Sequence, residues 1–468
     1  MQPIDLSIKK RRRTSTTKVG DTFIGSDYPI RIQSMANTDT NDIAASVEQA
    51  KRIIVAGGEL VRFTTQGIKE VESLRQTVQT LRMEGYTAPI VADVHFNANV
   101  ADEAAKVVEK VRINPGNYVD PARKFIHLEY TDDEYKAELR RLRERFVRLL
   151  GICKENHTAL RIGVNHGSLS DRIMSRYGDT PAGMVESCME FLRVCKEEEF
   201  ADVVISIKAS TTKIMVETVH LLVETMDKED MHFPLHLGVT EAGEGEDGRL
   251  KSALGIGALL ADGIGDTIRV SLSEAPEAEI PVAQELVSYY GDTTVILRSL
   301  YGDESKMTYH SEEDGSWERF CIHAAADLGR PLFDRPVKQL VIENPNFPQE
   351  KLDTLSKDIL QAAGIVRYKT EYVSCPSCGR TLFDIEKTIA EVKAATQHLQ
   401  GLKIGIMGCI VNGPGEMADA DYGYVGAGRG NVSLYKGKEC VLKNIPREEA
   451  VGELVKLIKE NGDWKEKE

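Results

Sequence analysis

The stretch that decides the fold reads ALRIGVN, residues 159–165. It is almost entirely apolar, which is typical of a strand that is buried on both faces of a sheet. Similar short runs recur through the first 280 residues, each followed by a polar loop and a helical pattern. The strands that we expect are residues 30–35, 58–65, 89–95, 110–115, 159–165, 202–210, 234–240 and 266–272.

Helical patterns alternate with these strands. They cover residues 41–55, 69–82, 100–109, 134–153, 180–198, 212–225 and 250–260. Buried strands that alternate with amphipathic helices indicate a parallel sheet that is covered on its outside. Because eight strands are expected, we predict an α/β protein whose residues 1–280 form a (β/α)8 TIM barrel. Residues 17–28 contain two Gly-rich turn signals, and we expect a hairpin there that closes the bottom of the barrel.

The rest of the chain forms two further predicted regions. Residues 281–370 break the rhythm, with helical patterns at 282–290, 317–328 and 349–362 and strand patterns at 338–343 and 365–372. We expect this inserted segment to be a spacer or a small packing subdomain. Residues 371–468 contain a strand, a Cys pair, a helix at 384–399, a strand at 403–408, a Gly-rich loop and a helix at 447–460. This order predicts a smaller C-terminal α/β domain.

The composition restricts the partners and the location. The 468 residues include 59 Lys and Arg against 73 Asp and Glu, which gives a formal net charge of −14. This acidic balance argues against nucleic-acid binding, and no apolar run is long enough for a membrane helix. Residues 9–13 are all basic and precede polar residues, so we expect a solvated arm there, with an electrostatic contact as the alternative, and not a secretory signal. Eight Cys in so long a chain fit a reducing cytoplasm better than a disulfide framework.

Three cysteines form a candidate metal site. Cys375 and Cys378 are separated by two residues, and Cys409 follows at the end of an apolar strand. A structural zinc site needs a fourth Cys or His nearby, and the sequence places Glu416 there instead. Three thiolates and an exchangeable carboxylate suit an iron–sulfur cluster, with zinc or unligated thiols as the alternatives. We expect the cysteines in helical patterns to be small buried side chains: Cys153, Cys188, Cys195 and Cys321.

Five barrel strands carry a cation inside an otherwise apolar run. These cations are Arg62, Arg112, Arg161, Lys208 and Arg269. A buried cation is unfavourable without an anion, and the barrel carboxylates that could neutralise some of them are Asp93, Asp202, Glu241 and Asp266. Five cations around one ring are hard to neutralise internally. Because TIM barrels place their sites at the carboxyl ends of the strands, we predict a pocket there for a small phosphorylated dianion.

Polar side chains follow the ends of the same strands. They are Asn114, Asn117, Asn165, Ser168, Ser210 and Ser271. His95 and His236 fit either a ligand-binding role or a packed position in the core. Glu241 follows the seventh strand and is the best placed general acid, with an ion pair to an arginine as the alternative.

Taken together, the barrel, its cations and the cysteine set resemble the 4-hydroxy-3-methylbut-2-en-1-yl diphosphate synthase family, which acts in the methylerythritol phosphate pathway of isoprene biosynthesis. The segments that carry the resemblance are residues 91–96, 112–117, 161–169, 206–210, 236–243, 263–272, 375–378 and 408–416. The resemblance implies an iron–sulfur oxidoreductase that opens the ring of 2-C-methyl-D-erythritol 2,4-cyclodiphosphate reductively, with loss of water. The implied product is (E)-4-hydroxy-3-methylbut-2-enyl diphosphate.

The resemblance also implies a role for each site residue. A [4Fe–4S] cluster would be held by Cys375, Cys378, Cys409 and Glu416. Glu241 would serve proton transfer, Glu416 would be catalytic as the exchangeable cluster ligand, and Asn412 would contact substrate beside the cluster. The remaining substrate-binding residues would be Arg62, His95, Arg112, Asn117, Arg161, Asn165, Lys208, Arg269 and Ser271.

Partners and geometry follow from the same resemblance. Ferredoxin or flavodoxin would supply the electrons. Two-domain members close barrel and cluster between the subunits of a homodimer, whereas members with a large insertion can close within one chain, and the segment 281–370 is intermediate in length. The competing hypotheses are a zinc-stapled TIM-barrel enzyme of non-redox phospho-sugar or pterin chemistry and a cluster protein that carries electrons without a substrate.

Overall fold

The computed structural model describes residues 2–119, 129–209, 211–291, 298–376, 378–410, 415, 417, 419–428 and 430–466. Eight parallel strands form its largest sheet: β4 (Arg31–Met35), β5 (Leu60–Thr65), β6 (Ile90–Val94), β7 (Lys110–Ile113), β8 (Ala159–Asn165), β9 (Val203–Lys208), β10 (His236–Leu237) and β11 (Thr267–Ile268). β11 pairs with β4, and a parallel bridge from Ile205 to Leu235 joins β9 to the residues before β10. The strands therefore close into a ring, and the predicted TIM barrel is confirmed.

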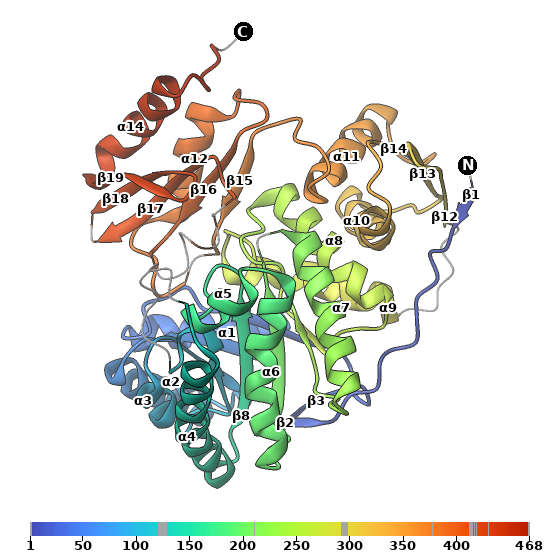
Figure 1. Cartoon of the computed structure of the whole chain (residues 1–468). Coiled ribbons are helices and arrows are strands. Elements are labelled where there is room, and N and C mark those ends of the chain that lie inside the picture. Colours follow the sequence, from blue (N-terminus) through green and yellow to red (C-terminus); the bar gives the residue numbers. More distant parts are fainter. Residues whose placement is uncertain are drawn as a thin grey trace.

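Helices surround this barrel (Figure 1). They are α1 (Ile43–Val55), α2 (Ile68–Met83), α3 (Ala98–Ala104), α4 (Asp132–Asn156), α5 (Asp171–Tyr177), α6 (Pro181–Glu197), α7 (Thr212–Lys228), α8 (Gly245–Ala261) and α9 (Glu279–Gly291). Local sequence fixes their starts: a capping box of Thr131 and Glu134 begins α4, and Thr180 with Pro181 begins α6.

The predicted hairpin closes the bottom of the barrel. Its strands are β2 (Thr17–Val19) and β3 (Thr22–Ile24), which pair antiparallel. Val19 and Ile24 are fully buried and form one apolar cluster with Leu60 and Val91, which begin or nearly begin their strands. Apolar contact of this kind makes the bottom of the barrel a packed core and leaves the opposite end for a site.

The prediction of a solvated N-terminal arm is wrong for two of its arginines. Arg11 donates to Asp266 at 2.7 Å and to the carbonyl oxygen of Gly25 at 3.0 Å. Arg12 pairs with Asp227 and leaves only 13% of its side chain exposed. The carboxylates that bind the arm lie more than 200 positions away in the sequence, so no local pattern could reveal them.

An inserted unit lies beside the barrel, at the upper right of Figure 1. Its sheet has the order β1 (Gln2–Ile4), β12 (Arg298–Gly302), β13 (Lys306–Ser311) and β14 (Gln339–Glu343), with the helices α10 (Trp317–Asp334) and α11 (Gln349–Ala362). The N-terminal residues thus complete a sheet made almost 300 positions later. The strand expected at 365–372 is wrong over most of its length, because the backbone N–H groups of Tyr368 and Lys369 donate to the Gln361 side chain instead of a neighbouring strand.

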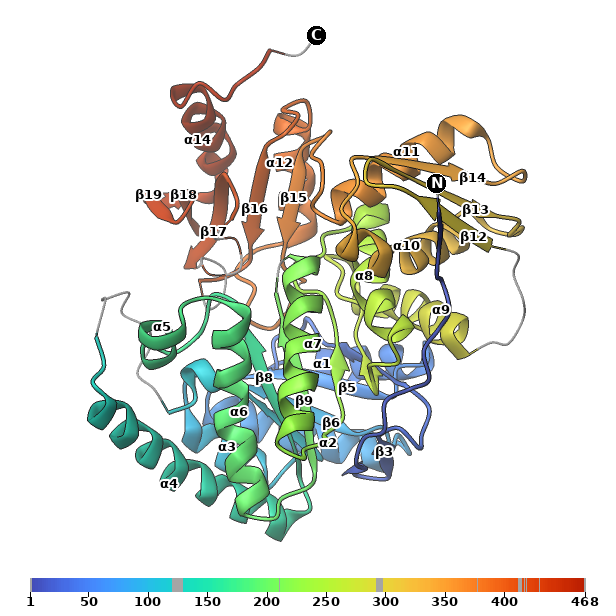
Figure 2. The same ribbon diagram turned by 45° about the vertical axis from the view of Figure 1, so that its right-hand side comes forward.

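A C-terminal unit follows, with five strands and two described helices. The strands are β15 (Glu371–Ser374), β16 (Lys403–Met407), β17 (Tyr422–Gly428), β18 (Asn431–Lys436) and β19 (Glu439–Pro446), and the helices are α12 (Ile385–Thr396) and α14 (Arg447–Glu460). The antiparallel strands β17 to β19 were not expected from the sequence, which suggested a Gly-rich loop. Figure 2 shows that β15 and β16 point their carboxyl ends toward the mouth of the barrel.

Direct contacts hold the C-terminal unit on the barrel. The hydroxyl oxygens of Ser273 and Ser374 lie 2.8 Å apart, and Lys393 pairs with Glu244 at 2.7 Å. Gly167, with φ +78°, lies so close to Gly415 that an added Cβ would be 2.6 Å from the Gly415 carbonyl carbon. Only glycine fits this approach. Across the described ranges, no helix is both long and apolar enough to cross a membrane.

Candidate functional site

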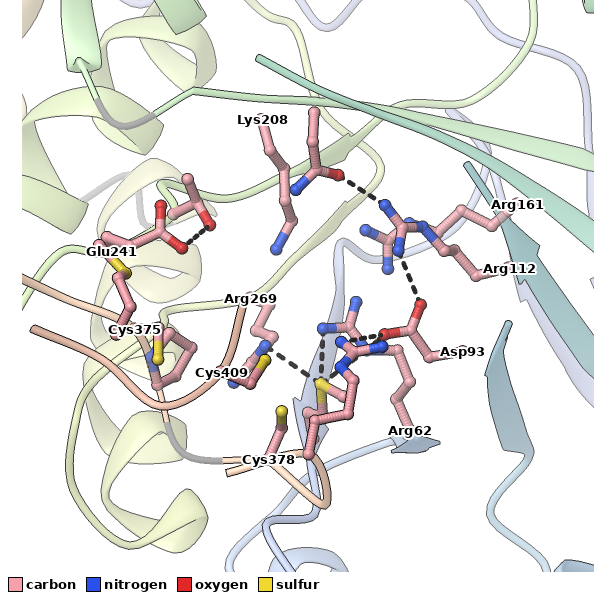
Figure 3. Close-up of a pocket in the computed structure, with 16 residues that line it drawn as sticks. Arg62, Asp93, Arg112, Arg161, Lys208, Glu241, Arg269, Cys375, Cys378 and Cys409 are labelled. Atoms are coloured by element: carbon pink, nitrogen blue, oxygen red, sulfur yellow. Dashed lines mark hydrogen bonds and ion pairs between the residues drawn. The ribbon is translucent and has the colours of Figure 1, made fainter. Parts of the chain in front are cut away.

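One pocket lies between the mouth of the barrel and the C-terminal unit. Figure 3 shows Cys375, Cys378 and Cys409 facing the barrel cations across it. The described residues that line it are Met35, Arg62, Asp93, Arg112, Arg161, Asn165, Lys208, Thr240, Glu241, Arg269, Cys375, Pro376, Cys378, Arg380, Met407 and Cys409. The tertiary structure therefore brings the predicted anion pocket and the predicted metal site together within one chain.

Arg161 is the least compensated of these cations. Its side chain is fully buried, and its Nε donates to Ser206 Oγ at 3.0 Å. Both terminal nitrogens, Nη1 and Nη2, are buried without a hydrogen-bond partner in the part of the chain that the structure describes. Burial, and then the charges of Arg62 and Arg112, lower the pKa of Arg161 well below its usual range. An anion in the pocket would remove both penalties.

Lys208 and Arg62 show the same excess of positive charge. Burial, followed by repulsion from the neighbouring arginines, lowers the pKa of Lys208 well below its ordinary value. Burial lowers the pKa of Arg62 to about 9, although Asp93 opposes the shift. The pocket is thus built for a ligand with negative charge.

Asp93 is the carboxylate around which several of the cations gather. Arg112 Nη1 donates to it at 2.9 Å, while Arg62 and Arg380 lie 4.0 and 3.5 Å from it. Burial alone would raise its pKa, but Arg112 and Arg62 hold the pKa of Asp93 well below the usual value. Asp93 therefore fixes the directions of the guanidinium groups without neutralising all of them.

The prediction that Asp202 and Asp266 neutralise pocket cations is wrong, and Glu279, which does so, was missed. Asp266 binds Arg11, and Asp202 accepts from the backbone N–H of Lys18 at 2.8 Å, so both serve the bottom of the barrel. They precede their strands, whereas the cations lie farther along them. Arg269 instead pairs with Glu279 of α9 through two hydrogen bonds of 2.8 and 3.0 Å.

Both histidines are buried polar residues of the barrel. His95 contacts Arg112 and Asn117, and burial together with the charge of Arg112 lowers its pKa to about 3. The pKa of His236 is also lowered well below its ordinary value, by burial and then by Arg161 and Lys208. A neutral imidazole is therefore expected at both positions at neutral pH. Neither ring is among the groups that line the pocket.

Glu241 lies at the boundary between barrel and cysteines. It is 1% exposed, has a positive φ of 47°, and accepts a hydrogen bond from Thr240 Oγ1 at 3.0 Å. A positive φ is uncommon for a residue with a side chain and is found often at functional sites. The position of Glu241 between the cations and Cys375 suits a group that moves a proton.

The three cysteines share the opposite wall. Cys375 Sγ accepts a hydrogen bond from the backbone N–H of Gly408 at 3.2 Å, and burial followed by Cys409 and Cys378 raises its pKa well above the usual value. A metal centre would supply the positive charge that stabilises these thiolates. Among the described side chains, no three His, Cys, Asp or Glu gather closely enough to hold a single metal ion.

The predicted site residues are distributed unevenly. The pocket is lined by Arg62, Arg112, Arg161, Asn165, Lys208, Glu241, Arg269 and the three cysteines, whereas His95, Asn117 and Ser271 are buried and do not line it. Asn412 and Glu416 lie outside the described residues, and so does Ser210. Arg380, which lines the pocket, was missed. Its position two residues after Cys378 was the available signal.

The fold and the pocket define a TIM-barrel protein with a second, thiol-bearing unit over a barrel mouth that cations line. Family models for the GcpE TIM-barrel domain and the GcpE protein C-terminal domain match residues 14–284 and 371–460. The chain belongs to the GcpE family.

Named relatives agree over nearly the whole length. The chain is 49% identical to 4-hydroxy-3-methylbut-2-en-1-yl diphosphate synthase (flavodoxin) of Bacteroides fragilis, covering 99% of this chain and 98% of that protein. It is 45% identical to 4-hydroxy-3-methylbut-2-en-1-yl diphosphate synthase (ferredoxin) of Parasynechococcus marenigrum, covering 97% of this chain and 96% of that protein. The Bacteroides alignment spans 613 positions, more than the 468 residues of this chain, so that relative contains sequence that this chain lacks.

Proposed function

We propose that this chain is a 4-hydroxy-3-methylbut-2-en-1-yl diphosphate synthase, which converts 2-C-methyl-D-erythritol 2,4-cyclodiphosphate to (E)-4-hydroxy-3-methylbut-2-enyl diphosphate. The observation that carries the proposal is the single pocket in which uncompensated buried cations face three thiols. The names of the full-length relatives support the same reaction. They do not favour a zinc-stapled, non-redox enzyme.

The barrel binds the charged end of the substrate in this proposal. Arg161 and Lys208 are the principal contacts to the diphosphate, because their charges are the least compensated. The fork of an arginine suits two phosphate oxygens at once. Arg62, Arg112, Asn165, Arg269 and Ser271 complete the cradle, with His95 and Asn117 supporting it from behind.

The chemistry occurs at the other wall. The reaction takes up two electrons and one proton, breaks a carbon–oxygen bond of the ring, and releases water. Cys375, Cys378, Cys409 and Glu416 would hold a [4Fe–4S] cluster, which when bound delivers electrons singly from flavodoxin or ferredoxin. Glu241 holds the proton that leaves with the hydroxyl group, and Asn412 contacts the substrate beside the thiols. Closure of the C-terminal unit excludes water from the pocket.

The proposal includes the organisation of the chain. Residues 1–280 form the substrate-binding barrel, 281–370 the inserted unit and 371–468 the cluster domain. Barrel and cysteines already share a pocket within one chain, so a homodimer is not needed to complete the site. The chain acts in the cytoplasm, where thiols remain reduced.

Oxygen-free purification tests this function. We expect a brown protein with four iron and four sulfide per chain that consumes the cyclic diphosphate when a low-potential reductant is present. Cys375→Ser should remove the visible absorbance and lower turnover by about 1000-fold or more, because one of the four proposed cluster ligands is lost. Cys321→Ser is the control, since this buried thiol lies in the inserted unit. Zinc in place of iron and sulfide would exclude the proposed reaction.

Glu416 needs its own test, because it is proposed as the exchangeable ligand. Glu416→Ala should keep most of the iron, which three thiolates still bind, while turnover falls. If turnover by Glu416→Ala equals that of the natural protein, the fourth ligand is a different group.

A further inference from the structure

Arg380 is the pocket cation that the C-terminal unit supplies. The other cations that line the described pocket lie on barrel strands or at their ends. Arg380 lies two residues after Cys378, and its side chain is 9% exposed. Its Nη2 is 3.5 Å from Asp93 Oδ2 of the barrel. Its Nη1 is buried and finds no hydrogen-bond partner within the described ranges.

An ion pair with Asp93 does not explain this arrangement. Asp93 already accepts a hydrogen bond from Arg112 at 2.9 Å and has Arg62 at 4.0 Å. Arg380 is therefore the third guanidinium at one carboxylate, and its contact with Asp93 is longer than the hydrogen bond from Arg112. Across the described lining there are six Lys or Arg side chains against two carboxylates. Burial would lower the pKa of Arg380, but Cys378, Asp93 and Cys409 stabilise its charge and hold this pKa above the usual value. They leave its Nη1 without a hydrogen-bond acceptor among the described residues. A buried donor of this kind gains free energy when an acceptor enters.

We propose that Arg380 is a further substrate-binding residue, whose Nη1 donates to a diphosphate oxygen so that the C-terminal unit grips the substrate directly. This inference rests on the proposed function. It means that the thiol-bearing unit contacts the bound anion directly, because Nη1 of Arg380 has no acceptor among the described residues until the anion is present.

The position of Arg380 also suits the change in charge during the reaction. Opening the ring turns a bridging oxygen into a terminal phosphate oxygen, and the electron pair of the broken carbon–oxygen bond stays on that oxygen. With two electrons and one proton taken up and water released, the linear diphosphate carries one more negative charge than the cyclic substrate. A cation between the thiols and the phosphates stabilises that added charge.

Binding of the cyclic diphosphate to the oxidised holoenzyme, measured by calorimetry without oxygen, tests the inference. Arg380→Met should weaken binding about 30-fold, as expected for the loss of one charge-assisted hydrogen bond and a nearby charge. Arg380→Lys keeps the positive charge beside Asp93 but loses the two terminal N–H donors of the guanidinium group, so it should weaken binding about 5-fold. This variant should remain folded even if Arg380→Met does not. The visible spectrum of both variants should match that of the natural protein.

Lys393→Met is the matched control. Lys393 pairs with Glu244 across the same interface but does not line the pocket. If Lys393→Met weakens binding as much as Arg380→Met, Arg380 acts only through closure and the inference is wrong. Equal affinity of both Arg380 variants and the natural protein would also overturn it. Failure of the natural protein itself to bind the cyclic diphosphate would instead overturn the proposed function, and this inference with it.

Discussion

Two buried clusters of charge among the described residues differ in whether their members are paired. In the pocket, Arg161 has two terminal nitrogens without a described partner. In the inserted unit, Asp327 of α10 accepts hydrogen bonds from Tyr289 and Tyr309 at 2.8 Å each and pairs with Arg298. The second cluster is satisfied by the protein alone.

A second group in the inserted unit also has its charges paired. His323 is 1% exposed, and its two ring nitrogens lie 2.8 Å from the carboxylates of Glu285 and Glu313. These residues come from α9, α10 and the loop after β13, so the pairing joins the inserted unit to a barrel helix. Satisfied buried charges fix a structure, whereas unsatisfied ones mark the place where a ligand completes it. This contrast separates the structural cluster from the functional one.

Removal of an unpaired arginine is expected to have the largest effect on binding without destabilising the fold. Arg161→Met should weaken binding of the cyclic diphosphate about 1000-fold, because two charge-assisted hydrogen bonds are lost. The midpoint of thermal unfolding should stay equal or rise, since an uncompensated buried charge disappears. Calorimetry and thermal unfolding measure the two quantities.

Arg172→Met provides the matched comparison within the same barrel. Arg172 is as deeply buried but pairs with Glu190. Its loss should lower the free energy of unfolding and leave the affinity for the cyclic diphosphate unchanged. The distinction between the two kinds of arginine fails if Arg161→Met is the less stable of the two variants.

Removing the carboxylate of the paired cluster around Asp327 should lower the stability of the fold and leave substrate binding unchanged. Asp327→Ala leaves Arg298 and two buried tyrosine hydroxyls without their acceptor, so the free energy of unfolding should fall by about 3 kcal/mol. Denaturant unfolding measures this loss. The KM for the cyclic diphosphate should not change, and a raised KM would show that the inserted unit takes part in the site.

The smallest expected effect is a dependence of stability on pH. Burial raises the pKa of Asp327 from 3.8 to about 6, despite the opposing charge of Arg298. Between these values the folded chain keeps a proton that the unfolded chain has released, so stability falls as the pH rises from 4 to 6. The contribution is roughly 2 kcal/mol, taking each pKa unit as about 1.4 kcal/mol and allowing for partial relaxation. Unfolding at several pH values should show this slope in the natural protein and a flatter one in Asp327→Asn.

Much of the barrel and its cations could be predicted because each signal is local. An arginine inside a run such as residues 159–165 must be buried wherever that strand lies, and the carboxyl end of a barrel strand faces the mouth. The three antiparallel strands β17 to β19 were missed, because Gly-rich sequence at residues 422–428 resembles a loop until a neighbouring strand pairs with it. The β1 strand was missed because it has only three residues, which are too few to show a periodicity before β12 pairs with them.

By itself, the sequence determined that the chain forms eight buried strands, five of which carry a cation, that it contains a cysteine set, and that it resembles a known family. These follow from the periodicity and spacing of neighbouring residues. Only the tertiary structure decided which charges are paired: Glu279 with Arg269, Asp266 with Arg11, and Asp93 with Arg112. Tertiary structure also placed Arg380 at the barrel mouth. Electrostatic interactions depend on distance in space, and partners that lie far apart in a sequence have no spacing from which that distance could be inferred.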